Sequence, residues 1–158
     1  MGKKLRNFLS LPFWIKRLYF EAYWSLAHAR VIKSFPFTRV VHKLKLQNYE
    51  TSFDKKEDPA IKAIAKAIDV MQKYTFWESA CLVQAIAAMK MLERRNIDST
   101  LYLGTSKDKE GLMIAHAWLR SGSMYVTGGA NCANFTVVST FGKFVEIHRY
   151  EEGANVKS

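Results

Sequence analysis

Two side chains have the chemistry of a nucleophile and its base, the thiol of Cys81 and the imidazole of His116. Cys81 lies near the start of a predicted helix, where the helix dipole and unpaired backbone N–H groups stabilise a thiolate. The same N–H groups can hold the oxyanion that forms when a thiolate attacks a carbonyl. His116 lies in a predicted strand, and the two residues can meet in the fold whatever their separation in sequence. The pair predicts a cysteine-dependent enzyme that acts on a peptide or amide bond.

Structural roles would also explain these residues. A cysteine in an apolar helix is often a small buried side chain. His116 lies in an apolar segment, 114–119, as a histidine satisfied within a core would. Trp77 and Trp118 flank the two candidates and could wall a substrate cleft, although packing in the core suits both rings equally well. The sequence leaves these alternatives open.

A third group is expected to orient the imidazole of His116. The predicted tight turn at 121–123 sets His116 opposite Thr127 or Gly128, and an acid would be expected there. Residues 117–145 contain no Asp or Glu, so the pair could also act as a dyad. The neutral groups that could take the third role are a backbone carbonyl and the side chains of Thr127, Asn131 and Asn134.

The first part of the chain, residues 1–50, is predicted to be a basic, aromatic and helical N-terminal region. Apolar residues recur at helical spacing from 11 to 32. Pro36 ends that helix, and a short helix is expected over 37–46. The polar residues 47–57 that follow indicate a connector.

The second part, residues 58–150, is predicted to be the core domain that carries the chemistry. Asp58 as N-cap and Pro59 at the first helical position predict the start of one helix. A second helix over 75–95 begins with a capping-box pattern and is apolar almost all round, which predicts a central position in the fold. Four segments rich in β-formers follow, and helices followed by antiparallel strands indicate an α+β fold. These segments are 100–104, 112–120, 124–127 and 135–140.

Charge is distributed unevenly along the 158 residues. The formal net charge is +10, and residues 1–50 hold ten Lys or Arg against two Glu. This excess of basic residues in the N-terminal region predicts an anionic partner, such as an acidic protein, a membrane surface or nucleic acid.

The two cysteines, Cys81 and Cys132, are too few for a disulfide scaffold, and they fit a reducing cytoplasm. No Cys or His cluster has the spacing of a zinc site, so neither a metal nor a cofactor is expected. The sequence has no stretch of 18 or more apolar residues that would predict a membrane-spanning helix. We expect a cytoplasmic protein.

The motifs around the two candidates resemble the lasso-peptide leader peptidases, the transglutaminase-like B proteins of lasso-peptide biosynthesis. The similar region covers roughly residues 12–142. The segments that carry the resemblance are 78–85 around Cys81, 101–104, 115–119 around His116, 126–129, 135–142 and, upstream, 21–37.

The resemblance implies a papain/transglutaminase-like fold, with a central Cys-bearing helix packed on an antiparallel sheet that carries the His. It implies a cysteine protease that hydrolyses the bond between leader and core in a ribosomally made precursor, with Cys81 as nucleophile and His116 as base. The implied partners are the precursor peptide, a small leader-recognition protein and an ATP-dependent macrocyclase. The Asp of that family is not matched, because Thr127 and Gly128 stand in its segment.

Four other functions remain to be weighed. A non-catalytic peptide-binding module of the same fold is favoured by the missing acid, and an acyl transferase would join an amine in place of water. An interfacial helix over 5–33 would make the chain a peripheral membrane protein, which we favour less. Nucleic-acid binding has no known motif in its support, so no nucleic-acid partner is expected. The precursor, the cleavage site and the oligomeric state are not predicted.

Overall fold

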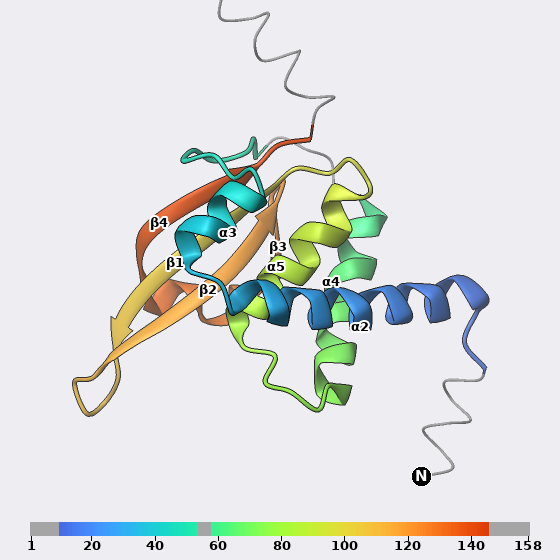
Figure 1. The fold of residues 1–158 in the computed structure, drawn as a ribbon, viewed down its shortest axis with the longest axis horizontal. Coiled ribbons are helices and arrows are strands. Elements are labelled where there is room, and N and C mark those ends of the chain that lie inside the picture. Colours follow the sequence, from blue (N-terminus) through green and yellow to red (C-terminus); the bar gives the residue numbers. More distant parts are fainter. Residues whose placement is uncertain (1–9, 54–57, 146–158) are drawn as a thin grey trace, which may run out of the picture.

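Helices lie on one side of a four-stranded antiparallel sheet in the computed structural model, which describes residues 10–53 and 58–145 (Figure 1). The strand order is β3-β2-β1-β4. The expected α+β class is therefore confirmed, and the arrangement is consistent with the expected papain/transglutaminase-like fold.

The N-terminal region forms two helices, as predicted. Helix α2 spans Phe13–Lys33 and α3 spans Phe37–Lys43, with Pro36 at the N-cap of the second helix. Helix α2 buries one stripe at helical spacing and packs along α5 and α4, so it shares the core of the domain. The buried apolar residues of α2 are Leu18, Ala22, Leu26, Ala29 and Ile32.

Helix α4 spans Pro59–Met71 and begins as its sequence predicts. The carboxylate of Asp58 accepts a hydrogen bond from the backbone N–H of Ala60 at 2.8 Å, and Pro59 takes the first helical position, where no N–H is needed. The short 3-10 helix η1, Gln72–Tyr74, continues the chain from the end of α4.

Helix α5 spans Cys81–Glu93, so the predicted start at residue 75 is wrong. The hydroxyl of Thr75 donates to the carbonyl of Gln72 at 2.8 Å and lies 2.9 Å from the hydroxyl of Ser79. These bonds belong to a loop before the helix. The predicted capping box would instead need the Thr75 hydroxyl to bind an N–H group of the helix itself. The predicted central position is correct, because α5 is covered by α2, α4 and the sheet, and eight of its side chains are buried.

The sheet consists of β1 (Ser99–Lys107), β2 (Met113–Ser121), β3 (Met124–Thr127) and β4 (Thr136–Lys143). The 3-10 helix η2, Gly129–Asn134, joins β3 to β4. All four strands occur where β-formers predicted them, but β1 and β4 extend beyond the predicted segments.

The predicted register of the β2–β3 hairpin is wrong for His116. Thr127 pairs with Leu119, because the register shifts between Leu119 and Arg120 and β3 is short. His116 pairs with Gly104 of β1 on its other side. From Met113 to Trp118, the edge of β2 that faces away from β1 thus has no strand partner in the part of the chain that the structure describes.

A buried arginine anchors the connector on the sheet. Arg120 of β2 is 1% exposed, and its guanidinium donates to the carbonyl of Thr51 at 2.9 Å and to the hydroxyl of Tyr102 at 2.9 Å. It also lies 3.3 Å from Glu50 and stacks on the ring of Phe53. Residues 50–53 are therefore fixed to the sheet, while residues 54–57 of the predicted connector lie outside the described residues.

Among the described residues, none of the helices combines the length and the apolar character that crossing a bilayer requires.

An ion-pair cluster ties α2 to the end of α5. The carboxylate of Glu21 accepts from Arg95 at 2.7 Å and from Arg94 at 3.0 Å. The hydrogen bond from Arg95 is the main cause that holds the pKa of Glu21 below its ordinary value of 4.5, and partial burial opposes that shift. Because the folded pKa is lowered, the cluster contributes stability above pH 4.5 and loses it as the pH falls through the lowered value.

Glu21→Gln is expected to lower the free energy of unfolding by about 1 kcal/mol at neutral pH, a value reduced for solvent screening of a partly exposed pair. Urea unfolding at several pH values would measure the difference from wild type, which should shrink below pH 4.5. Glu110→Gln, at an exposed residue of the β1–β2 loop, is the control. A Glu21→Gln effect that is equal at neutral and acid pH would contradict this assignment.

Candidate active site

The thiol of Cys81 stands on the first residue of α5, and the residue before it cannot cap the helix. Ala80 is the N-cap and has no side-chain oxygen. The backbone N–H groups of Cys81, Leu82 and Val83 make no hydrogen bond to any residue that the structure describes, because the first helical bond runs from Gln84 to the Ala80 carbonyl. A helix start without a side-chain cap leaves first-turn N–H donors and the positive end of the helix dipole at the residue that carries the half-buried thiol.

The loop before Cys81 is held by a polar side chain that sequence reasoning missed. Gln84 donates from its amide nitrogen to the carbonyl of Ser79 at 2.7 Å and also contacts the side-chain oxygen of Gln72. A lone Gln within the apolar run of α5 was the available signal. These contacts hold the backbone just before the nucleophile candidate in place, so the position of Cys81 at the start of α5 is fixed by the loop as well as by the helix.

The imidazole of His116 is held by a backbone carbonyl. Its Nε2 lies 2.9 Å from the carbonyl oxygen of Gly128. A carbonyl oxygen can only accept a hydrogen bond, so Nε2 must carry the proton. Nδ1 is then the unprotonated nitrogen of the neutral ring, and no described residue forms a hydrogen bond with it.

A stack of rings packs around the same imidazole. Trp118 lies against it with ring centroids 5.8 Å apart and stacks on Tyr102 at 5.5 Å. The ring of Phe135, just after η2, has its centroid 4.9 Å from that of His116. Trp118 is buried, so in this structure it supports the imidazole and offers little surface to a substrate.

Neither Thr127 nor Asn131 reaches His116 with a hydrogen bond in the described part of the chain. The Thr127 hydroxyl is buried without a partner, and Asn131 is exposed on η2. Of the groups expected to orient the imidazole, the backbone carbonyl is the one found in the structure, and it belongs to Gly128. Gly128 has φ +69°, and a Cβ on it would come within 2.6 Å of the Ala117 carbonyl and 3.1 Å of the His116 ring, so this close approach requires glycine.

The lengths of α5 and β1 relate the start of α5, with Cys81, to the strand residue that pairs with His116. The end of α5 lies near the start of β1, because Glu93 pairs with Lys143 of β4 at 2.8 Å and Lys143 is the strand partner of Ser99. Thirteen helical residues span about 20 Å, the length of about six strand residues. Counted forward along β1 from Ser99, this length reaches Gly104, the residue paired with His116.

The two side chains do not hydrogen-bond to each other within the described residues. Strand alternation places His116 and Trp118 on the face away from Ala117 and Leu119, which pack into the core with α5. The imidazole lies at the unpaired edge of β2 beside Gly128. A reaction between the pair therefore needs the thiol to approach Nδ1 at this edge.

Trp77 lies in the loop before α5 and contacts α2. Its ring is 5.3 Å from that of Tyr23 and 4.6 Å from that of Phe76, and its indole N–H is buried without a partner. Trp77 thus packs against the helical layer beside the start of α5. In the described ranges, no group of three or more His, Cys, Asp and Glu residues gathers to hold a metal ion.

Gly128→Ala is expected to displace the carbonyl from His116, because the new methyl group would collide with backbone and ring atoms. Nitrogen-15 NMR of the imidazole should show a proton on Nε2 at neutral pH in wild type and a mixture of tautomers in the variant. Gly111→Ala is the matched control, since Gly111 also has positive φ, +80°, but open space around its Cβ position. A wild-type ring with its proton on Nδ1 would contradict this assignment.

Comparison with known proteins identifies the family to which the fold belongs. The family model of the transglutaminase-like superfamily matches residues 22–140, which include α2, the start of α5 with Cys81, and His116. No curated protein and no solved structure was found to match the chain. Because the match spans most of the chain, the protein belongs to the transglutaminase-like superfamily.

Proposed function

We propose that this chain is a cysteine peptidase with Cys81 as nucleophile and His116 as base. The observation that carries the proposal is the start of α5, where a thiol stands on a helix N-terminus without a side-chain cap, beside three N–H donors that bind no described residue. Membership of the transglutaminase-like superfamily supports it, because the fold commonly serves cysteine peptidases and acyl transferases.

The chemistry begins with proton transfer from the Cys81 thiol to Nδ1 of His116, whose Nε2–H is held by the Gly128 carbonyl. The thiolate attacks the scissile carbonyl carbon, and the resulting oxyanion accepts from the first-turn N–H groups of α5. Cleavage of the C–N bond sends the imidazolium proton to the leaving amine. Water then attacks the thioester, releases the carboxylic acid and restores the thiol.

For the substrate, we propose the leader–core bond of a lasso-peptide precursor. The support is the resemblance of residues 12–142 to the leader peptidases of that biosynthesis. The precursor peptide and a small leader-recognition protein would be the partners, and an ATP-dependent macrocyclase would use the freed amine. Two free cysteines suit a reducing cytoplasm as the place of reaction.

The second candidate is a peptide-binding module of the same fold without chemistry. The absence of a hydrogen bond between Cys81 and His116 in the described residues favours it, together with a carbonyl where an acid would stabilise the imidazolium. An acyl transferase would use the same residues and differ in the acceptor, an amine in place of water.

The test is a mass-spectrometric cleavage assay with precursor, leader-recognition protein and this chain. Wild type should make one cut between leader and core and release the leader as a free acid. Cys81→Ala and His116→Ala should each lower the rate by roughly a hundredfold or more. Cys132→Ala, which removes the other free thiol, is the control and should cleave at the wild-type rate.

Each outcome separates the candidates. Cleavage that survives in Cys81→Ala, or none at all when all three components are shown to be bound, would favour the binding module. Release of the leader as an amide of an added amine would indicate the acyl transferase.

A further inference from the structure

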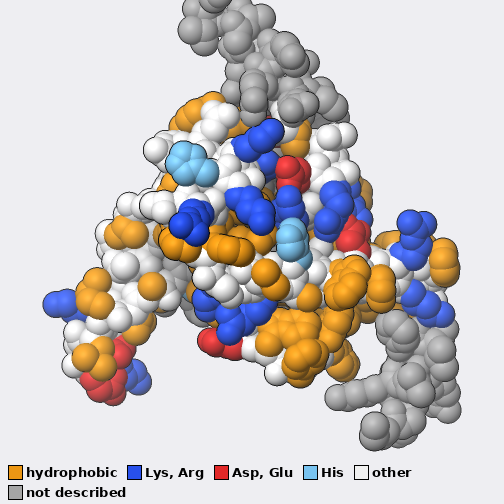
Figure 2. Space-filling view, in the orientation of Figure 1, with side chains coloured by type: hydrophobic (Ala, Val, Ile, Leu, Met, Phe, Trp, Pro, Cys, Tyr) orange, Lys and Arg blue, Asp and Glu red, His pale blue; other side chains and the backbone are white. Residues whose placement is uncertain are grey.

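Helix α2 also exposes large apolar side chains outside the stripe that it buries in the core. Phe13, Trp14, Phe20 and Trp24 are between 62% and 75% exposed. Figure 2 shows hydrophobic side chains gathered over this helix with Lys and Arg side chains around them. A cluster of large exposed aromatic side chains on a folded domain indicates an interaction surface.

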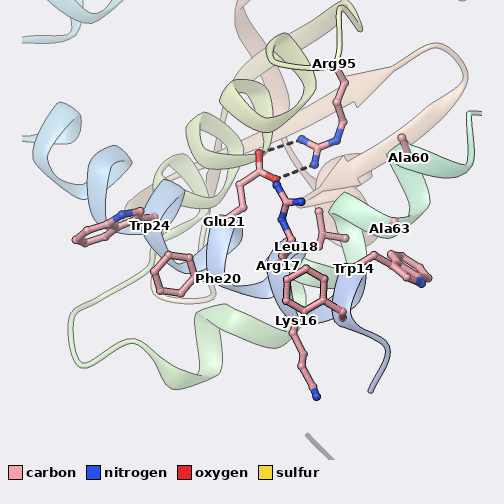
Figure 3. A pocket seen from close by; sticks show the side chains of 11 residues that line it. Trp14, Lys16, Arg17, Leu18, Phe20, Glu21, Trp24, Ala60, Ala63 and Arg95 are labelled. Carbon is pink, nitrogen blue, oxygen red and sulfur yellow. Dashed lines mark hydrogen bonds and ion pairs between the residues drawn. The ribbon is translucent and has the colours of Figure 1, made fainter. Parts of the chain in front are cut away.

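This face is hollowed, because α4 presents small residues to it. A groove of about 880 Å³ follows α2, with Trp14 beside Ala63 of α4 and with Phe20 and Trp24 further along α2 (Figure 3). We call this hollow and its neighbour the α2 groove. The neighbouring hollow, about 620 Å³, shares Glu21 and Trp24 and extends to Val31.

The α2 groove has the length of a helical segment. From Phe13 to Val31 it follows α2, a distance of about 27 Å at 1.5 Å per residue. An amphipathic helix that lies in such a groove inserts apolar side chains at every third or fourth position. Neither Cys81 nor His116 lines the groove, so this surface is separate from the candidate active site.

The charge of the α2 groove is positive. Lys16, Arg17, Arg94 and Arg95 line it, against the single carboxylate of Glu21. Glu21 is already bonded to Arg94 and Arg95. Arg17 is exposed and has no hydrogen bond or ion pair with any residue in the described ranges. The surplus of cations fits an acidic ligand.

We propose that the α2 groove binds an acidic amphipathic helix of a partner protein, with apolar side chains between Trp14, Phe20 and Trp24 and carboxylates at Arg17. A second copy of the chain fits poorly, since two faces of the same positive charge would repel. A membrane surface fits less well than a helix, because it would not fill a hollow between two helices. The proposal concerns binding alone and does not rest on peptidase activity.

The test uses three synthetic peptides of about 18 residues, the length of the α2 groove. The first carries Leu and Phe on one helical face and Glu on the other, the second has Lys in place of Glu, and the third is a scrambled version of the first. Titration calorimetry with the full chain should detect binding of the first peptide alone, and added salt should weaken it. Cys81→Ala should bind it as wild type does, which separates this result from the proposed catalysis.

Variants locate the binding site. Arg17→Glu and Trp24→Ala change exposed side chains and should each weaken binding by roughly tenfold or more. Leu112→Ala and Lys107→Glu, at exposed residues of the β1–β2 hairpin, should leave it unchanged. Circular dichroism would confirm that all variants are folded.

Three results would overturn the proposal. One is equal binding of the acidic and scrambled peptides, and another is binding that Arg17→Glu and Trp24→Ala leave unchanged. The third is failure to bind the acidic peptide while vesicles of phosphatidylserine and phosphatidylcholine are bound through Trp24, which would assign the face to a membrane surface.

Discussion

The burial of α5 between α2, α4 and the sheet is the constraint on which the other elements depend. Ala85, Ala87 and Ala88 are fully buried, and their small side chains let α2 and the sheet approach the helix closely. A helix packed in this way has its backbone bonds satisfied internally except at its ends. The end that carries Cys81 is only half-buried and has no side-chain cap, so the packing that stabilises the domain leaves the nucleophile candidate beside N–H groups that no described residue binds.

The imidazole of His116 is oriented by a backbone carbonyl, whereas many cysteine enzymes use a side chain for this purpose. The Gly128 carbonyl fixes the tautomer of His116 and leaves Nδ1 as the proton acceptor. A neutral carbonyl stabilises an imidazolium less than a carboxylate would. The rings of Trp118 and Phe135 then supply part of the positioning by packing, and orientation in this site depends on shape more than on charge.

The sequence was sufficient for features set by local chemistry. Asp58 and Pro59 predicted the start of α4 because capping is decided within a few residues, and β-formers predicted the strands. The start of α5 was missed, because Thr75 bonds within its loop. The bulge next to Leu119 changed the register, and no side-chain pattern marks a carbonyl such as that of Gly128. The sequence also could not predict which face of α2 stays exposed, because that depends on the side that α4 and α5 cover.

The central claim is that His116 activates the thiol of Cys81, and alkylation kinetics test it most directly. In a Cys132→Ser background, one free thiol remains, and intact-protein mass spectrometry can follow its reaction with iodoacetamide at neutral pH. The account predicts that His116→Ala slows alkylation by roughly tenfold or more, because the base that removes the thiol proton is gone. Equal rates with and without His116, under conditions in which both proteins are folded, would show that the two residues do not act together and would contradict the account.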